Sequence, residues 1–397
     1  MKHLRKLCDN KGVELSEDIR MEILHLLPSK SLARFKCVSK CWQKYIADCR
    51  SQRWRPQPDF IGFFHQSWKT RKLSQIRFFS ESKESNNNPI DLDESVNFLS
   101  RRVYIVASSN GFLLCTKHRK NTMAYYVYNP ATRQHLALPK TLLCMNDDLA
   151  VGFICNVDDR NKDVISFTIV RYEIPRHWGE LQYGVAIESF SSETNVWTDN
   201  IVDLDEPLRN LFNWNLKSKS SSSLPSAGVI DGVFCWLDQA GTRITAYDSG
   251  YNCFWALELT EEMELALELT GSYRTSCFLG LSGGAFYFAF NSGEGITVWK
   301  LESDIRCRDA VWVKKYSVNV AATVPFGLKG SLHIDVQNMV IHPVFPHIFY
   351  LDVRGKFISY DLETDIAELV YDFREPWWRT QHYKLFPYEW HQWPRLL

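Results

Sequence analysis

Residues 110–115 read Asn-Gly-Phe-Leu-Leu-Cys, and residues 125–132 read Tyr-Tyr-Val-Tyr-Asn-Pro-Ala-Thr. The Asn-Gly pair is a turn signal, and the apolar run behind it has the length of a buried strand. The aromatic run that follows has strong strand propensity and ends at Asn-Pro, another turn signal. The two segments together therefore predict two consecutive strands, each bounded by a turn.

This pair of segments recurs along the chain. The further copies are residues 231–236 with 244–248, 283–288 with 296–299, and 346–351 with 357–361. The aromatics that close the second strand are Tyr128, Phe190, Tyr247, Trp299 and Tyr360, at spacings of 62, 57, 52 and 61 residues. A second aromatic trails in what we expect to be a third strand, at Trp197, Trp255 and Trp312.

A period of 50–60 residues with three or four strands per unit is typical of β-propeller blades of kelch-like size. Phe78 lies 50 residues before Tyr128 and can mark another blade, so five or six units are visible. An open β-sandwich is the alternative. We expect the tryptophans to pack between blades, with a ligand platform as the less favoured interpretation.

The composition is that of an ordinary globular protein, with 397 residues, 45% hydrophobic and 23% charged. Formal net charge is zero, but residues 1–55 hold 13 Lys/Arg against 6 Asp/Glu. A basic head suggests an acidic partner, or simply a solvated helical surface. No dense Lys/Arg run interleaved with aromatics is present, which argues against nucleic-acid binding.

The 11 cysteines are scattered without CxxC pairs, as expected for reduced thiols in a cytoplasmic or nuclear protein. Cys37 and Cys41 are one helical turn apart without a second Cys/His pair at zinc spacing. We expect no metal and no cofactor. Neither a signal peptide nor 18 consecutive apolar residues occur, so we expect no membrane association.

The first fifty residues predict three short helices. Ser16 can cap the first helix, which carries Ile19, Ile23, Leu24 and Leu27 at helical spacing before Pro28 ends it. A second helix carries Leu32 and Phe35, and a third carries Val38, Trp42, Tyr45 and Ile46. So small a unit buries little surface. Its apolar stripes either hold the helices together or face a partner.

These residues resemble an F-box over residues 13–55. The matching blocks are residues 14–19, 22–24, 27–32 and 34–42, with Leu15-Ser16 where the family usually has Leu-Pro. The resemblance implies docking onto a Skp-family adaptor. The positions that it implies face or support the adaptor are Leu15, Ile19, Leu24, Leu27, Pro28, Leu32, Val38 and Trp42.

The remainder, over roughly residues 100–390, resembles the plant F-box-associated domain. The resemblance rests on Asn129-Pro130-Ala131-Thr132-Arg133 with Leu138-Pro139, Gly152-Phe153, Ile341-His342-Pro343, Ser359-Tyr360-Asp361-Leu362 and Phe386-Pro387-Tyr388. It implies a kelch-like β architecture that binds a target protein. The tail departs from the family, with Glu389-Trp390-His391-Gln392-Trp393 replacing the usual small and aliphatic ending.

The predicted organisation is a small all-α F-box at 13–55, a linker and first β segment at 56–99, and an all-β, propeller-like target-binding domain at 100–390. Residues 81–89 and 217–226 are expected to be exposed loops. The aromatic-rich tail at 376–397 is expected to pack onto the β domain, where it can close the ring, with an exposed target-contact strip as the alternative.

Catalytic motifs are lacking: no Gly-rich phosphate loop, no GxSxG and no HExxH occur. The acidic pairs Asp147-Asp148 and Asp158-Asp159 are read as solvated turns, and His342 and His347 as isolated histidines. No thiol lies in an evident electropositive motif with a histidine base. The predicted function is the non-catalytic substrate receptor of an SCF-type ubiquitin ligase, joined to cullin through the adaptor. The alternatives are an F-box scaffold without cullin and a propeller enzyme.

Overall fold

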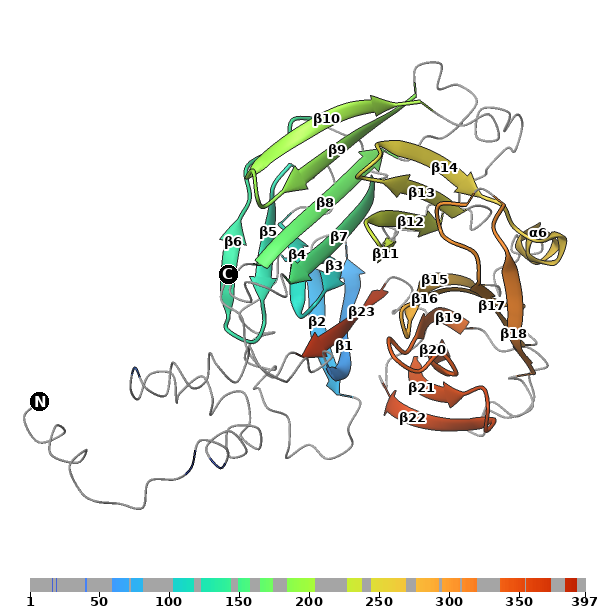
Figure 1. The fold of residues 1–397 in the computed structure, drawn as a ribbon. Coiled ribbons are helices and arrows are strands. Elements are labelled where there is room, and N and C mark those ends of the chain that lie inside the picture. The colour runs from blue at the N-terminus through green and yellow to red at the C-terminus, as the bar shows by residue number, and fades with distance from the viewer. Residues whose placement is uncertain are drawn as a thin grey trace, which may run out of the picture.

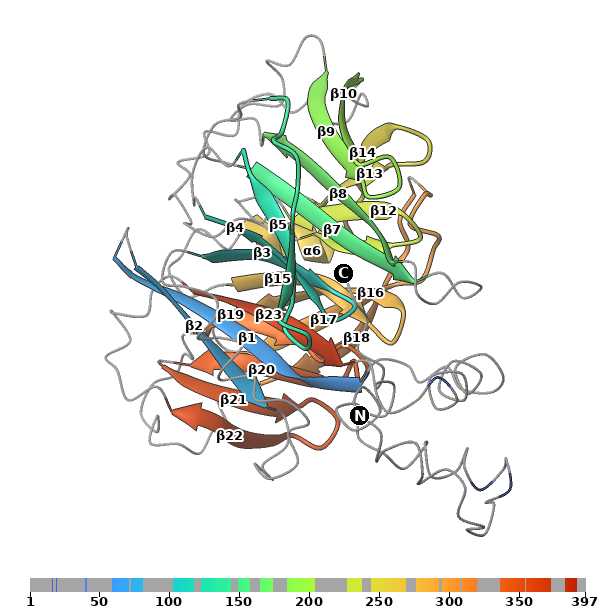
Figure 2. The same cartoon turned by 90° about the vertical axis from the view of Figure 1, so that its left-hand side faces the viewer.

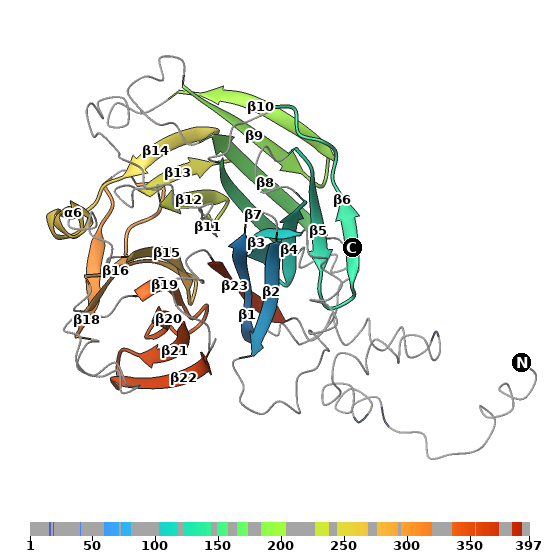
Figure 3. The same cartoon turned by 180° about the vertical axis from the view of Figure 1, so that it is seen from behind.

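The fold is a ring of six β-sheets. The computed structural model describes Ser16, Ile19, Lys40 and residues 59–70, 73–80, 103–117, 123–143, 149–157, 165–173, 184–203, 227–237, 244–268, 276–292, 295–307, 309–319, 336–353, 355–372 and 383–390. Five sheets have four strands and one has three. Figures 1 and 3 show the sheets around the ring from opposite sides. The chain is therefore a six-bladed β-propeller, which confirms the predicted architecture and excludes the sandwich.

The first three blades contain the N-terminal half of the propeller and its last strand. Blade 1 contains β1 (Asp59–Thr70), β2 (Leu73–Ser80) and β23 (Tyr383–Trp390). Blade 2 contains β3 (Tyr104–Ser109), β4 (Phe112–Thr116), β5 (Tyr125–Asn129) and β6 (Gln134–Ala137). Blade 3 contains β7 (Leu149–Val157), β8 (Ile165–Glu173), β9 (Val185–Ser191) and β10 (Val196–Val202).

The other three blades follow in chain order. Blade 4 contains β11 (Gly228–Ile230), β12 (Val233–Leu237), β13 (Ile244–Asp248) and β14 (Cys253–Leu257), and the helix α6 (Glu261–Glu268) comes after it. Blade 5 contains β15 (Ser276–Ser282), β16 (Ala285–Asn291), β17 (Ile296–Leu301) and β18 (Trp312–Val318). Blade 6 contains β19 (Val336–Ile341), β20 (Ile348–Val353), β21 (Lys356–Asp361) and β22 (Ile366–Asp372).

Blade 1 closes the ring with strands from both ends of the propeller sequence. β23 pairs antiparallel with β1, from Asp59 opposite Trp390 to Ser67 opposite Tyr383. Figure 2 shows β1 between β2 and β23. Backbone hydrogen bonds therefore join the first strand of the propeller to the last. The expectation that the aromatic-rich tail packs onto the β domain and closes the ring is confirmed for residues 383–390.

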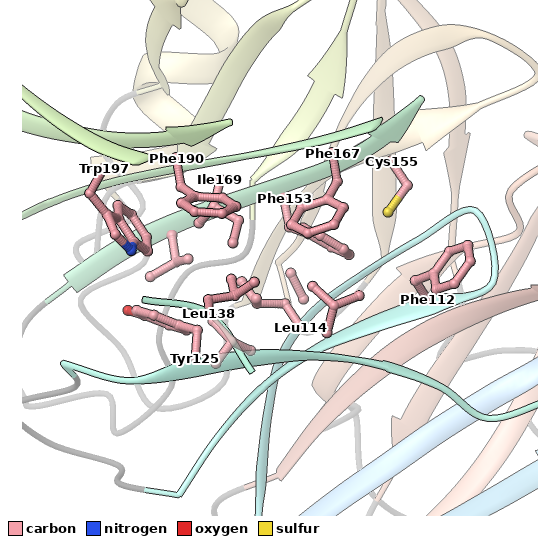
Figure 4. Packing of buried hydrophobic residues seen from close by; sticks show 14 of the residues in the cluster. Phe112, Leu114, Tyr125, Leu138, Phe153, Cys155, Phe167, Ile169, Phe190 and Trp197 are labelled. Carbon is pink, nitrogen blue, oxygen red and sulfur yellow. The ribbon is translucent and has the colours of Figure 1, made fainter. Parts of the chain in front are cut away.

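A hydrophobic cluster fills each of the six interfaces between neighbouring blades. Between blades 2 and 3, for example, Phe112, Leu114 and Tyr125 face Phe167 and Trp197 (Figure 4). The remaining clusters join blades 3 and 4, 4 and 5, 5 and 6, 6 and 1, and 1 and 2. A blade cannot bury both its faces alone, so the ring is held together mainly by apolar burial between blades.

In blades 2, 4 and 5 the hairpin between the first and second strand uses residues that accept a positive φ. Asn110-Gly111 and Asp231-Gly232 both have positive φ at the two positions, and Gly283-Gly284 does the same. This is the requirement of a two-residue type I′ turn, whose twist matches that of the flanking strands. The Asn-Gly, Asp-Gly and Gly-Gly pairs of the repeat are therefore first hairpins.

The turn between the third and fourth strand has its own repeated chemistry. Asn129 Oδ1 accepts the N–H groups of Ala131 and Thr132, and the corresponding residues Ser191, Asp248 and Asp361 each accept at least one such N–H group. Four residues later a left-handed residue ends each turn: Arg133, Asn195, Asn252 and Asp365. The marker aromatics Tyr128, Phe190, Tyr247 and Tyr360 directly precede these turns.

The expected count of three or four strands per blade agrees with the structure, but the position of the aromatics within each blade needs a correction. The marker aromatics lie on the third strand and not on the second, and Trp197, Trp255 and Trp312 lie on the fourth and not on the third. The first strand escaped the sequence pattern because it carries no repeated aromatic, and β11 is only three residues long. The expectation that these tryptophans pack between blades is confirmed, since all three are buried within interblade clusters.

Candidate functional site

The two ends of the propeller differ in the kind of chain connection that they carry. Turns from first to second strand and from third to fourth strand lie at one end, which we call the tight-turn end. We call the opposite end the long-loop end, because connections from one blade to the next lie there. These connections include residues 138–148, 203–227, 258–275 and 319–335. Asp59 lies at the tight-turn end, because it pairs with Trp390, the last residue of the first strand of blade 1. The F-box segment therefore joins the propeller at the tight-turn end.

The F-box residues are described at three positions. Ile19 is helical, and its backbone N–H donates to Ser16 Oγ at 3.4 Å, which is the capping geometry expected from the sequence. The Ile19 side chain is 47% exposed, and its expected contact with the adaptor stays a prediction. The other implied adaptor positions lie outside the described residues: Leu15, Leu24, Leu27, Pro28, Leu32, Val38 and Trp42.

A buried carboxylate organises the tight-turn end at blades 4 and 5. Asp248 Oδ1 accepts the backbone N–H groups of Gly250 and Tyr251, and its Oδ2 accepts Arg306 Nε at 2.7 Å. Nη2 of Arg306 donates to the backbone carbonyl of Asp231. The hydrogen bond that Arg306 donates to Asp248 is the largest cause of the raised pKa of Arg306. The Asp248 side chain thus fixes two groups: the turn that carries the exposed Tyr251, and Arg306 of the next blade.

The turn from β19 to β20 presents apolar side chains at the same end. His342 Nδ1 accepts the N–H groups of Val344 and Phe345, both at 3.0 Å, and the imidazole packs on the Phe345 ring. The carbonyl of Pro343 accepts Gly283 N–H from blade 5 at 2.8 Å. Phe345 is nevertheless 48% exposed and Val344 39%. The buried His342 and the hydrogen bond from Gly283 thus hold the turn, while its apolar side chains face solvent.

The long-loop end is braced by a buried ion pair. Arg171 and Glu188 are fully buried, and Arg171 Nε donates to Glu188 Oε2 at 2.7 Å. The other carboxylate oxygen accepts the N–H groups of Leu142 and Leu143, in the connection from blade 2 to blade 3. The guanidinium also lies 5.6 Å from the centre of the Trp197 ring. This pair therefore fixes the backbone of the connection from blade 2 to blade 3, which is a structural role.

The indoles of the fourth strands connect adjacent blades in the same manner. Trp197 Nε1 donates to the carbonyl of Pro139 at 2.9 Å, and Trp312 Nε1 donates to that of Glu258 at 2.9 Å. Both acceptors follow the last strand of the preceding blade. These tryptophans are hydrogen-bonded within the interblade core, so they are not available as ligand platforms.

Two of the described thiols lie in surroundings that disfavour reactivity. Cys115 and Cys235 are buried, and burial raises the pKa of both thiols. Raised values disfavour the thiolate that a nucleophile requires. Among the described residues no group of three or more His, Cys, Asp or Glu could hold a metal ion, and no described helix is long and apolar enough to cross a membrane. His342 and His347 belong to one turn and Asp147, Asp148, Asp158 and Asp159 lie outside the described residues.

Sequence reasoning missed both ion pairs and the helix α6. Arg306 and Asp248 are 58 residues apart, and Glu188 is 46 residues from Leu142. A separation in sequence does not by itself show which side chains meet across two blades. The helix had a readable signal, since Thr260 accepts Met263 N–H with its hydroxyl and precedes an acidic first turn. The expected loops at 81–89 and 217–226 lie outside the described residues.

Comparison with known proteins gives the class first: this is an F-box protein with a β-propeller. The F-box domain family matches residues 13–54, and the family described as "F-box protein At3g26010-like, beta-propeller" matches residues 90–383. The second match covers most of the chain, so the chain belongs to this family of propeller-containing F-box proteins. The domain boundaries drawn from the sequence stay a prediction.

Relatives in Arabidopsis thaliana resemble the whole chain. F-box protein At5g03970 is 26% identical over 96% of this chain and 88% of its own length. F-box protein At5g49610 is also 26% identical, over 94% of this chain and 92% of its own length. F-box protein At1g30790 is 33% identical, but over 31% of this chain and 33% of its own length. The similarity to plant F-box proteins thus extends across both the F-box and the propeller.

Proposed function

We propose that this protein is the substrate receptor of an SCF-type (Skp–cullin–F-box) ubiquitin ligase. The observation that carries the proposal is the union of two modules in one chain: an F-box domain at 13–54 and a closed six-bladed propeller. F-box domains generally bind a Skp-type adaptor, and propellers generally bind proteins. The chain would thereby hold a target protein beside a ubiquitin-charged enzyme.

The receptor acts by raising local concentration, without a chemical step of its own. Tethering converts ubiquitin transfer into an effectively intramolecular event, which increases its rate without any catalytic group on the receptor. Burial raises the pKa of the Cys115 and Cys235 thiols, so these two residues are poorly suited to carry ubiquitin as a thioester. The proposed setting is the cytoplasm or the nucleus, with neither nucleic acid nor membrane as a partner.

We assign target binding to the long-loop end of the propeller. The F-box segment joins the opposite end at Asp59, so a target at the long-loop end leaves the adaptor side free. The connections at this end are long; residues 203–227 and 258–275 are two of them. Surface connections can vary while the strands stay constant, which suits a recognition surface.

Affinity purification of the tagged full-length chain from plant cells with a blocked proteasome tests the function. We expect adaptor, cullin and a ubiquitinated target to co-purify. A Leu27→Ala/Pro28→Ala variant should lose adaptor and cullin but keep the target, while Leu142→Ser, exposed on the propeller, should keep adaptor and cullin. Adaptor without cullin would replace the ligase by the scaffold, and retention of adaptor by the first variant would refute the docking residues.

A further inference from the structure

An apolar and acidic surface lies on the tight-turn end of blade 6. Its apolar part is Val344 and Phe345, and its acidic part is Glu363 and Asp365, which are exposed on the turn between β21 and β22. The two turns are joined directly, because Leu362 N–H donates to the carbonyl of His347 at 2.8 Å. We refer to these four residues as the blade 6 surface.

The blade 6 surface is held rigidly before any partner arrives. His342 Nδ1 fixes the backbone of both apolar residues, and the carbonyl of Phe345 accepts Ile348 N–H at 3.0 Å. Asp361 Oδ1 accepts the N–H groups of Glu363 and Thr364, which fixes the acidic turn. An exposed aromatic on a pre-organised turn loses little conformational freedom when it is covered, so it is well suited to binding.

Ring contacts connect this surface to the strand that follows the F-box segment in the chain. A path of ring contacts leads from Phe345 to His342 at 4.9 Å, from His342 to Tyr350 at 6.2 Å, and from Tyr350 to Phe63 at 4.6 Å. Phe63 is on β1, four residues after Asp59. The chain before Asp59 therefore starts beside blade 6, at the same end of the propeller.

The segment before Asp59 has the complementary chemistry. Residues 49–58 read Cys-Arg-Ser-Gln-Arg-Trp-Arg-Pro-Gln-Pro, with three arginines, one tryptophan and no acidic residue. Trp54 precedes Asp59 by five residues, which can span roughly 17 Å when extended. Tryptophan and arginine are the side chains most enriched at energetic centres of interfaces. Opposite charge and a short connection both favour this segment over an unrelated partner.

We propose that residues 50–55 of this chain dock on the blade 6 surface, with Trp54 covering Phe345 and the arginines facing Glu363 and Asp365. Docking holds the F-box in a fixed position at the tight-turn end of the propeller. A fixed position keeps the adaptor on one side and the long-loop end on the other, so the target is presented at a constant distance. This docking takes place within the chain alone and does not require adaptor binding.

Limited trypsin digestion of the full-length protein without adaptor tests the docking. Arg50 and Arg53 precede cleavable bonds, whereas Arg55 is followed by Pro56 and resists cleavage. We expect slow cleavage in the wild type. In Phe345→Ser the cleavage should be roughly tenfold faster, the factor that corresponds to about 1.4 kcal/mol of docking free energy. The matched control Leu142→Ser, 55% exposed in the connection from blade 2 to blade 3, should be cleaved like the wild type.

A charge exchange separates docking from misfolding. Glu363→Arg should accelerate cleavage at Arg50, and Arg55→Glu in the same chain should restore slow cleavage, because the attraction is re-formed with reversed signs. Near-ultraviolet circular dichroism should match the wild type in every variant. Equal cleavage rates in wild type and Phe345→Ser would overturn the proposal. So would a Phe345→Ser protein that loses its target with cleavage unchanged, or a wild-type dimer that this substitution dissociates.

Discussion

Arg306 of blade 5 donates from Nε to the buried carboxylate of Asp248 in blade 4, at 2.7 Å. The two residues belong to equivalent turns of adjacent blades, between the third and fourth strands. Asp248 uses its other oxygen for the turn amides of its own blade. The same carboxylate therefore stabilises a turn of blade 4 and binds an arginine of blade 5. Local turn formation is thereby coupled to the assembly of the ring.

Asp248→Asn should separate these two roles. Asn129 occupies the same position in blade 2, so asparagine can accept the turn amides while the ionic bond to Arg306 is lost. Asp248→Ala should destabilise the protein further, by about 2 kcal/mol, because the turn amides also lose their acceptor. Urea unfolding gives both values. The control is Asp361→Asn, the equivalent turn residue of blade 6. Equal losses in Asp248→Asn and Asp248→Ala would contradict the separation.

Ring closure gives the second prediction. A chain ending at residue 382 lacks β23, which exposes the apolar faces of blades 2 and 6 that Phe386 and Leu385 contact. We expect such a chain to aggregate and to bind a hydrophobic dye. A chain ending at Trp390 is the matched control, because it keeps β23 whole. Phe386→Ala should cost about 3–5 kcal/mol of unfolding free energy. A soluble, cooperatively folded chain without β23 would show that the ring does not need this strand.

The propeller could be predicted because its most informative residues repeat. Tyr247 and Asp248 end the third strand of blade 4, as Tyr360 and Asp361 do in blade 6, and each pair starts a turn that short-range hydrogen bonds specify. Local chemistry of this kind is visible in a sequence. First strands lack such a marker, so the sequence placed each marker aromatic one strand too early in its blade.

The interblade contacts could not be predicted from the sequence. Arg306 donates a hydrogen bond to Asp248, and the backbone N–H of Leu142 donates one to Glu188. Both hydrogen bonds depend on how two blades lie against each other. Their partners are distant in sequence and have no fixed spacing. The F-box family match over residues 13–54 and the cap by Ser16 agree with the sequence pattern, whereas the positions expected to face the adaptor stay a prediction.

Acid sensitivity gives the third prediction. Burial, followed by the charge of Arg77, lowers the pKa of His65 to about 3. Below pH 6.5 the unfolded chain therefore binds a proton that the folded chain does not, and stability falls as the pH decreases towards 3. Between pH 7 and pH 5 the loss from this residue is about 2 kcal/mol.

His65→Leu should remove this part of the pH dependence. Its unfolding free energies at pH 7 and pH 5 should differ less than those of the wild type, whatever the absolute stability of the variant. His135→Leu, at an exposed position on β6, is the control and should keep the wild-type difference. Urea titrations at the two pH values measure both. An unchanged difference in His65→Leu would show that other groups dominate between pH 5 and pH 7.

Separation of the two modules gives the last prediction. A chain without residues 1–55 keeps all six blades, so it should still bind the target through the long-loop end. It lacks the F-box, so it should not support ubiquitination. When overexpressed, this fragment should compete for targets and lengthen their half-life, whereas the full-length protein should shorten it only while the proteasome works. Cycloheximide-chase measurements of target half-life distinguish the two. A target that binds equally well to residues 1–55 alone would show that the propeller is not the receptor.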